Sequence, residues 1–327
     1  MINAVKILKS PIILAVLLYV LIYFVRWQQN SGWEIQTEIF KNQRQGMVEK
    51  IRQFLPPSQA ALLSGIVLGI KQDLPYNLKL ALRDTSTLHI VVASGQNLTI
   101  LAGFILHLAG FIRRKTAIIL AFSLIIGYTL LTGAQIPILR AAIMFGLASL
   151  AQTFGRENDG LWVLLITGGL LLLINPLWIS DLSFQLSFLA SFGVIVVAPV
   201  LEKFMNFLPN IIKENLVVTL GAQIMVTPVI ASNFHQFSLV SLVTNVLVLW
   251  IIPYIMGAGF IFLLFSNQLL GLILNIMLTY FIYIVEFFSH LPFAWEYVGD
   301  FHWTVWVGYY LIITSIVLLL NNGQTKT

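Results

Sequence analysis

Residues 160–200 read GLWVLLITGGLLLLINPLWISDLSFQLSFLASFGVIVVAPV and contain one charged side chain, Asp181. The two apolar runs in this stretch, 160–178 and 183–200, approach the roughly 20 residues that a helix needs to cross a bilayer. The same character extends through the chain, because 58% of its 327 residues are hydrophobic and 9% are charged. A soluble domain carries about 25% charged residues, so this composition excludes a soluble globular protein. It predicts an all-α polytopic membrane protein.

Polar and turn-forming breaks divide the chain into about ten predicted transmembrane helices, at least one of them broken. No small-residue cleavage site follows the first apolar run, so we expect that run to be retained as an anchor. The predicted spans cover residues 11–25, 88–112, 116–132, 135–154, 160–178, 183–200, 216–232, 238–264, 269–289 and 303–320. The predicted units are a transmembrane anchor (1–27), an outer amphipathic segment (28–86), a main transmembrane domain (87–320) and a short tail (321–327).

The distribution of lysine and arginine predicts the orientation of these spans. With the N-terminus in the cytoplasm, the inner segments carry nine basic residues and the four short outer loops carry none. Short cytoplasmic loops are enriched in Lys and Arg, whereas long segments do not follow this rule. We therefore expect both termini to be cytoplasmic, with the long segment 26–86 outside.

That outer segment has a helical pattern of its own. Apolar residues recur at helical steps over 33–54, and the helix should end before Pro56. Ser58 is expected to cap a second helix, and a third is expected over 76–84. The segment holds eight basic residues against five acidic ones, a net charge of 8 − 5 = +3. It is either a vestibule that receives a substrate or a set of interfacial helices that brace the bundle.

The stretch LHIVVASGQN (88–97) interrupts an apolar run with four consecutive small or polar residues. Such a break can unwind a helix inside the membrane and expose the positive N-terminus of the half-helix that follows. That terminus would suit an anionic group such as phosphate. The alternative is close helix packing at Ser94 and Gly95, with Gln96 and Asn97 bonded to a neighbouring helix.

The stretch GAQIPILR (133–140) places Pro137 in the first turn of a span and Arg140 about one turn deeper. A cation at that depth must pair, reach the interface or line water. In a wet pore its planar guanidinium would contact a phosphodiester. In the alternative interpretation it forms a structural ion pair, for which Glu286 is a candidate partner.

Two further stretches carry polar groups inside predicted spans. In DLSFQLSF (181–188), continuing to Ser191, one helical face is shared by Phe184, Ser187, Phe188 and Ser191, and Gln185 lies beside it. That face would let bases stack without sequence preference, or it is a packing surface with a polar hydrogen bond. Asn245 is an amide inside the eighth predicted span.

The motifs of several enzyme classes are missing from the sequence. There is no Gly-rich loop that ends in Gly-Lys-Ser or Gly-Lys-Thr, and the five histidines show no metal-binding spacing. We therefore expect no catalytic residues, no metal and no cofactor. Transport driven by another protein fits these residues better than catalysis.

Five collinear stretches resemble the competence domain of the ComEC family of DNA-internalisation proteins. They are AALLSGIVLGIKQDLP (60–75), LHIVVASGQN (88–97), GAQIPILRAAIM (133–144), INPLWISDLSFQLSFLASFG (174–193) and TLGAQIMVTPVIASNFHQFSLVSLVTNVLVLWIIP (219–253). The resemblance implies a channel in the bacterial cytoplasmic membrane that passes one DNA strand inward during natural transformation. The matched polar positions are His89, Ser94, Asn97, Arg140, Gln185, Ser187 and Asn245.

The chain departs from the family pattern at both ends. Residues 28–60 are too few for the outer oligonucleotide-binding β domain of full-length members, and no hydrolase domain follows the last span. The resemblance therefore implies separate partners: a DNA receptor, a nuclease and a cytoplasmic translocase ATPase, besides the single-stranded DNA and the lipid bilayer.

These observations define two sets of candidate residues and leave two rival functions. The rivals are a transporter or flippase for a lipid-linked or small anionic substrate, and a structural envelope scaffold. The pathway candidates are His89, Ser94, Gly95, Asn97, Arg140, Phe184, Gln185, Ser187, Phe188 and Asn245. The outer DNA-capture candidates are Lys41, Arg44, Lys50, Arg52, Lys71, Lys79 and Arg83.

Overall fold

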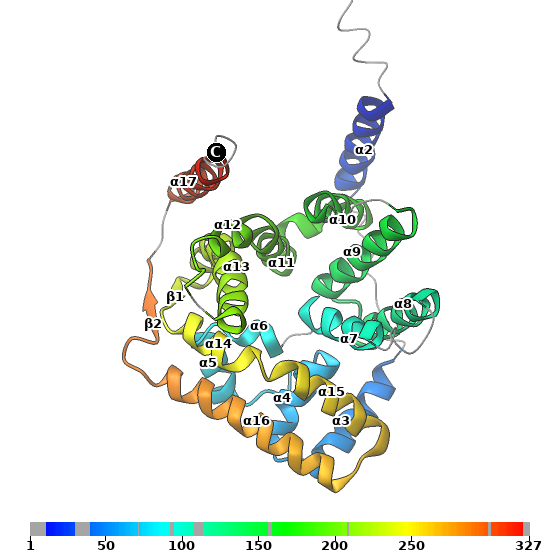
Figure 1. Ribbon diagram of the computed structural model, residues 1–327, viewed down its shortest axis with the longest axis vertical. Helices are drawn as coiled ribbons and strands as arrows, with labels where there is room; N and C mark the ends of the chain where they lie inside the picture. Colours follow the sequence, from blue (N-terminus) through cyan, green and yellow to red (C-terminus); the bar gives the residue numbers. More distant parts are fainter. Residues whose placement is uncertain are drawn as a thin grey trace, which may run out of the picture.

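The computed structural model describes residues 11–29, 40–70, 72–91, 95–107, 114–155, 159–207, 209–299 and 302–322, and they form an all-α fold with one short pair of strands (Figure 1). The first half contains α2 (Pro11–Gln28), α3 (Lys41–Phe54), α4 (Pro57–Leu68), α5 (Tyr76–Asp84), α6 (Leu88–Val91), α7 (Gly95–His107), α8 (Arg114–Leu131), α9 (Ile136–Thr153) and α10 (Gly160–Ile174). The second half contains the 3-10 turn η2 (Pro176–Ser180), α11 (Leu182–Phe192), the π-helical turn η3 (Gly193–Val197), α12 (Ala198–Glu202), α13 (Asn210–Phe234), β1 (Gln236–Ser238), α14 (Ser241–Leu249), α15 (Ile252–Phe265), α16 (Gln268–Ser289), β2 (Trp295–Tyr297) and α17 (Trp303–Asn322).

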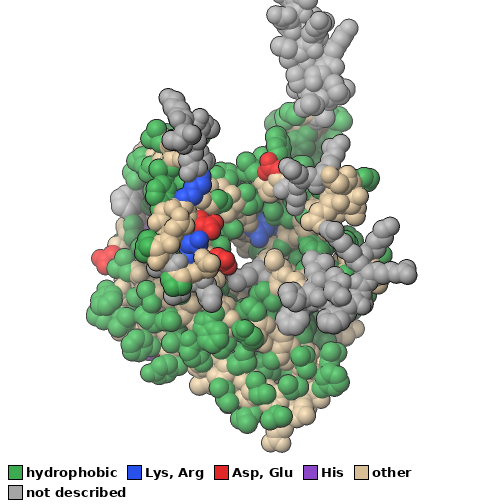
Figure 2. Space-filling view, in the orientation of Figure 1, with side chains coloured by type: hydrophobic (Ala, Val, Ile, Leu, Met, Phe, Trp, Pro, Cys, Tyr) green, Lys and Arg blue, Asp and Glu red, His purple; other side chains and the backbone are tan. Residues whose placement is uncertain are grey.

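Helix packing closes a ring in the middle of the molecule. Helix α7 packs on α9, α9 on α11, α11 on α13, α13 on α14, α14 on α15, and α15 returns to α7. Figure 2 shows the surface hollowed within this ring, with acidic and basic side chains gathered beside the hollow over α12 and α13. Helices α2 and α17 lie at the periphery (Figure 1).

The largest group of buried apolar side chains lies on one side of the ring, around α4. Nine of the twelve residues of α4 are buried, and Leu62, Leu63 and Ile66 are almost fully enclosed. Phe262 of α15 and Phe281 of α16 pack into the same cluster. The outer faces of α15 and α16 carry exposed apolar side chains, which form the green surface at the bottom of Figure 2. Such faces suit contact with lipid.

The structure tests the helix boundaries predicted for segment 28–86. Helix α5 has the predicted bounds, and α3 ends at Phe54, before Pro56, as predicted. The predicted helix does not run unbroken from 33, because Phe40 is the N-cap of α3 and lies outside the helix; residues 30–39 lie outside the described residues. The prediction that Ser58 caps the second helix is wrong, because Pro56 occupies that position and α4 begins at Pro57. Proline is favoured at the first helical position, where its missing N–H costs nothing.

By length and composition, four helical segments in the described part of the chain can cross a membrane, or five if α14 and α15 count as one bent span. The four segments are Ile136–Thr153, Leu182–Glu202, Lys213–Phe234 and Gln268–Ser289. Shorter apolar helices cover Pro57–Leu68, Thr116–Leu131, Gly160–Ile174 and Thr304–Leu320. The chain is thus a helical membrane protein, and its ten spans stay a prediction.

The predicted span 238–264 is broken in the structure. Helices α14 and α15 are bent by 45° where they meet. Pro253 stands in the first turn of α15 and has no N–H for the carbonyl of Leu249, the last residue of α14. A helix therefore cannot continue through this position without losing a hydrogen bond.

Two glycines bring α13 into backbone contact with the turn η3. A Cβ atom at Gly193 would overlap the carbonyl of Gly221, and a Cβ atom at Gly221 would press on the backbone of Gly193 and on Ala198. Small residues allow such close approach between helices in membranes. The two segments therefore pack through their main chains.

Pro228 leaves one main-chain carbonyl of α13 without its usual donor. Proline has no N–H for the carbonyl four residues earlier, which belongs to Ile224. Tyr309 of α17 donates a hydrogen bond to that oxygen at 2.9 Å, and Tyr310 donates to the carbonyl of Met225 at 2.9 Å. The two hydroxyls attach α17 to α13 at the interrupted turn.

A short antiparallel pair of strands joins two loops that the sequence places on the outer side. Gln236 of β1 lies opposite Tyr297 of β2, and Ser238 lies opposite Trp295. The pairing sets the C-terminal ends of α13 and α16 on the same side of the molecule (Figure 1). Two loops on the same side of a membrane are separated by an even number of membrane crossings, and the pairing agrees with this requirement.

We predict that replacing both Tyr309 and Tyr310 by Phe lowers the stability of the protein by about 1–2 kcal/mol. Each substitution removes one hydrogen bond to an interrupted turn, and such bonds inside membrane proteins contribute about 0.6 kcal/mol on average and up to about 1.7. Thermal unfolding of the purified protein in detergent measures the change. Tyr283→Phe, at an exposed position of α16, is the control. Equal melting temperatures for the double variant and the control would disprove this role for the two hydroxyls.

Candidate functional site

Arg140 joins two of the predicted motifs. It lies in the second turn of α9, which begins at Ile136 with Pro137 in its first turn, as predicted. Its Nη1 atom donates hydrogen bonds to the main-chain oxygen of Ser187 and to Oγ of Ser191, both on α11. The Ser191 hydroxyl donates in turn to the Ser187 oxygen at 3.0 Å. The guanidinium therefore links α9 to α11.

The third predicted motif meets the same guanidinium. The described part of α6 ends at Val91 and that of α7 begins at Gly95. Residues 92–94 lie outside the described residues, so the predicted break itself stays a prediction. A Cβ atom at Gly95 would lie 2.5 Å from Nη2 of Arg140 and 3.2 Å from Cβ of Ala141. The start of α7 therefore touches Arg140, and a side chain at Gly95 would displace the guanidinium.

Arg140 has no carboxylate partner among the residues that the structure describes. The predicted partner Glu286 is not in contact with it, so that ion-pair assignment is wrong. The Nε atom of Arg140 is buried and makes no hydrogen bond. The neutral oxygens of Ser187 and Ser191 satisfy part of the guanidinium, and its positive charge stays uncompensated within the described residues.

Asn97 bonds a neighbouring helix rather than the guanidinium. It is buried, and its Nδ2 atom donates to the carbonyl of Ile66 at 2.9 Å, in the last turn of α4. Gln135 reaches the carbonyl of Gly69 just beyond that turn, at 3.1 Å. The C-terminal end of α4 is thus capped by side chains from α7 and from the start of α9. This matches the packing alternative for Asn97.

The aromatic side chains of α11 contact each other. The rings of Phe184 and Phe188 stack with centroids 4.3 Å apart, and Phe188 packs against Gly168 of α10. Gln185 donates to the carbonyl of Ile179 in η2 at 2.9 Å. In this arrangement Phe184 is buried, so its surface is covered by protein. A stacking role for these rings stays a prediction.

The remaining pathway candidates do not join this group. His89 is exposed, and its Nδ1 atom lies 2.8 Å from the carbonyl of Ser86. Asn245 is buried in α14, where its Oδ1 atom has no hydrogen-bond partner among the described residues. Ser94 lies outside the described residues. The structure thus brings together Gly95, Arg140 and Ser187 and adds Ser191, which stands one turn after Ser187 on the same helical face.

Two of the outer basic candidates are ion-paired. Arg52 lies 2.8 Å from Asp73, and Arg83 lies 3.0 Å from Asp84. Lys50 and Lys79 are exposed on α3 and α5. Among the other candidates, Lys41 and Arg44 lie on α3, and Lys71 lies outside the described residues.

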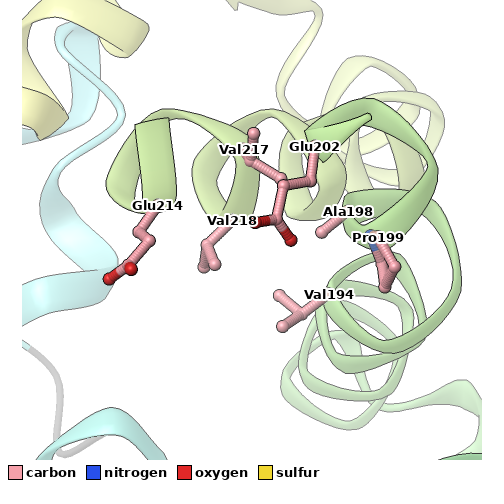
Figure 3. A pocket seen from close by; sticks show the side chains of 7 residues that line it. All are labelled: Val194, Ala198, Pro199, Glu202, Glu214, Val217 and Val218. Carbon is pink, nitrogen blue, oxygen red and sulfur yellow. The ribbon is translucent and has the colours of Figure 1, made fainter. Parts of the chain in front are cut away.

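A cavity of about 280 Å³ between α12 and α13 has no counterpart in the sequence predictions. Figure 3 shows the Glu202 carboxylate among its valines, with Glu214 extending away from them. Lys213 lies 3.4 Å from Glu202. Two acidic side chains do not favour a polyanion, so we assign this cavity no part in the pathway. Its walls are formed by Val194, Ala198, Pro199, Glu202, Glu214, Val217 and Val218.

Comparison with known proteins identifies the family. The family described as Competence protein matches residues 66–323, which is well over half of the chain. The chain belongs to the competence protein family. The resemblance inferred from the five collinear motifs is therefore confirmed.

Two curated relatives extend this result. ComE operon protein 3 of Bacillus subtilis (strain 168) is 28% identical over 210 residues, which cover 62% of this chain and 26% of that protein. Uncharacterized protein YcaI of Escherichia coli (strain K12) is 26% identical over 218 residues, covering 60% of this chain and 28% of that protein. The chain thus spans about a quarter of the length of the curated relatives it matches. No solved structure matches it.

We predict that Asn97→Ala destabilises the protein by about 1–3 kcal/mol, the usual cost of leaving a buried polar group unsatisfied. The substitution removes the donor that caps the Ile66 carbonyl. Thermal unfolding in detergent measures the change in stability, and Asn77→Ala, at an exposed position of α5, serves as the control. If Asn97→Ala is as stable as the control but DNA uptake falls, Asn97 acts in the pathway rather than in packing.

Proposed function

We propose that this chain passes single-stranded DNA through the bacterial cytoplasmic membrane during natural transformation. Its membership of the competence family and its likeness to ComE operon protein 3 support this role. One observation of the structure carries the proposal: Arg140 holds a positive charge without a carboxylate partner among the described residues, and its guanidinium lies against Gly95 of α7. An anionic backbone would supply the missing negative charge.

The proposed channel needs no chemistry of its own. Arg140 would contact the phosphates of a passing strand, and phosphate contacts carry no sequence information. Uptake would then be independent of sequence. A separate DNA receptor, a separate nuclease and a cytoplasmic translocase ATPase would deliver, trim and pull the strand. The chain is proposed to be a transporter and not an enzyme.

The proposed topology has ten spans with both termini in the cytoplasm. The charge distribution supports it, because the four short loops placed outside carry no Lys or Arg. In this orientation α3 and α5 face outward, and their exposed lysines would gather the polyanion before it enters. Counterion release drives such capture and makes it dependent on salt.

A second candidate function rests on the same charge. A transporter or flippase for an anionic lipid-linked substrate would use the broken helix and Arg140 in a similar way. Deletion of the gene distinguishes the two functions. A DNA channel predicts loss of transformation with unchanged lipid and envelope composition, whereas a flippase predicts changed lipids. A structural scaffold predicts that neither depends on Arg140.

We predict that Arg140→Ala reduces transformation at least about tenfold. A charge-assisted hydrogen bond contributes about 1.5–3 kcal/mol, and 1.4 kcal/mol corresponds to a factor of ten. Transformation frequency is measured in a naturally transformable host whose gene carries the variant, with membrane insertion checked by immunoblot of the membrane fraction. Lys203→Ala, at an exposed position just after α12, removes a positive charge elsewhere and is the control. Normal transformation by a correctly inserted Arg140→Ala protein would remove Arg140 from the pathway.

We also predict that reversing Lys50 and Lys79 to Glu weakens capture of DNA most strongly at low salt. The slope of log affinity against log salt concentration should fall by about 0.7 for each phosphate that the variant no longer neutralises. Binding of a fluorescent oligonucleotide to the purified protein measures this slope. Lys203→Glu with Lys213→Glu makes the same charge change on the predicted cytoplasmic side and should leave the slope unchanged. If both pairs behave alike, α3 and α5 only brace the bundle.

A further inference from the structure

One edge of the Arg140 guanidinium already donates hydrogen bonds within the protein. Nη1 donates to the main-chain oxygen of Ser187 and to Oγ of Ser191. The hydroxyl hydrogen of Ser191 is directed to the Ser187 oxygen at 3.0 Å, which leaves the lone pairs of Oγ to accept from arginine. The two acceptors of α11 therefore fix the orientation of the guanidinium plane.

The other edge, formed by Nε and Nη2, donates no hydrogen bond to a described residue. Nε is buried and has no hydrogen-bond partner, and Nη2 makes no hydrogen bond to a described residue. The N–H bonds of Nε and Nη2 are parallel and form a planar fork. Such a fork matches two oxygens of one carboxylate or phosphate group, which bind it in a bidentate manner.

This unused edge lies against the start of α7. A Cβ atom at Gly95 would lie 2.5 Å from Nη2, which is too close for two non-bonded atoms. Gly95 is the first described residue of α7, and the N-terminal end of a helix carries a partial positive charge. Two positive features thus lie side by side, and no carboxylate among the described residues offsets them. A bound anion would stabilise both.

We propose that the Nε–Nη2 edge of Arg140 and the first turn of α7 bind a single phosphodiester, and that Ser191 and Gly95 are positioning residues for this site. Ser191 would fix which edge of the guanidinium faces the ligand, and Gly95 leaves the room that the guanidinium occupies. The inference rests on the proposed function, in which the phosphodiester belongs to the DNA strand. An anionic phospholipid headgroup has the same chemistry, and the experiment separates the two sources.

The experiment uses the full chain, purified in detergent or placed in nanodiscs. The DNA probe is a fluorescent oligonucleotide of twelve thymidines, compared with the same oligomer carrying an uncharged methylphosphonate backbone. The lipid probe compares nanodiscs of phosphatidylglycerol with nanodiscs of phosphatidylcholine. If the site takes a phosphodiester of the strand, the charged oligomer binds at least about tenfold more tightly than the uncharged one, since the fork and the helix terminus both act on charge.

Three substitutions test the geometry, each with a matched control. Arg140→Lys keeps the charge but removes the fork, and Ser191→Ala removes the anchoring hydroxyl while the Ser187 carbonyl remains. Gly95→Ala displaces only the flexible tip of Arg140 and the Cβ contact with Ala141. The controls are Ser183→Ala, exposed on α11, and Gly103→Ala on α7, where a Cβ atom meets nothing within 4 Å.

Arg140→Lys is expected to weaken binding of the charged oligomer about tenfold, and Ser191→Ala and Gly95→Ala about three- to tenfold, as for the loss of one hydrogen bond. The controls should bind as the unmodified protein does. Ser191→Thr restores the hydroxyl and should restore the affinity, which a purely structural effect on α11 would not require. If Gly95→Ala fails to fold, the variants at Arg140 and Ser191 still decide the question.

The outcomes separate this inference from the proposed function. If Arg140→Lys and Ser191→Ala bind both probes as the unmodified protein does, the site is overturned, whether or not the chain supports transformation. If Arg140→Lys binds the oligomer as the unmodified protein does, whereas phosphatidylglycerol stabilises the unmodified protein and not Arg140→Lys, the site holds a lipid phosphodiester. In that case loss of the gene should leave transformation intact, so that the site would stand and the proposed function would fall.

Discussion

The constraint on which this structure depends is that every main-chain carbonyl freed by a helix break needs a donor, because apolar surroundings offer no water to supply one. The breaks here are numerous, and side chains from other helices satisfy the carbonyls they release. Asn97 serves the end of α4, and Tyr309 serves the turn interrupted by Pro228. These bonds connect helices that are distant in sequence. Breaking a helix therefore fixes its position in the bundle.

Arg140 differs from the other donors because it brings a charge as well as hydrogen bonds. Neutral amides and tyrosines would satisfy the same oxygens at a smaller desolvation cost, since a buried cation is expensive unless it is paired. Since a glutamine could donate to the same oxygens, the charge of Arg140 points to a second role, which is to attract an anion. Gly95 leads to the same conclusion, because any side chain at that position would overlap the guanidinium.

The sequence predicted the local breaks well and the contacts between them poorly. Composition and apolar runs predicted an all-α membrane fold, and Pro56 correctly marked the end of α3. Pro137 correctly marked the start of α9. The 45° bend before α15 was missed, although Pro253 is visible in the sequence, because unbroken hydropathy outweighed one proline. The hydrogen-bond acceptors of Arg140 were also missed. Charge pairing predicts a carboxylate partner, whereas the observed acceptors are the main-chain oxygen of Ser187 and the hydroxyl of Ser191. Such groups do not stand out in an apolar sequence.

The backbone contact between Gly193 and Gly221 makes one part of the ring stiffer than the rest. Where two main chains touch without side chains between them, neither helix can slide or rotate without steric overlap. The segment from α11 to α13 is thus a stiff half, whereas the hydrogen bonds that Arg140 of α9 makes to it come from a guanidinium on a flexible stem. A change in the width of the hollow would therefore come from movement of the α7–α9 half against this block. Arg140 would then lie where the moving and the stiff parts meet.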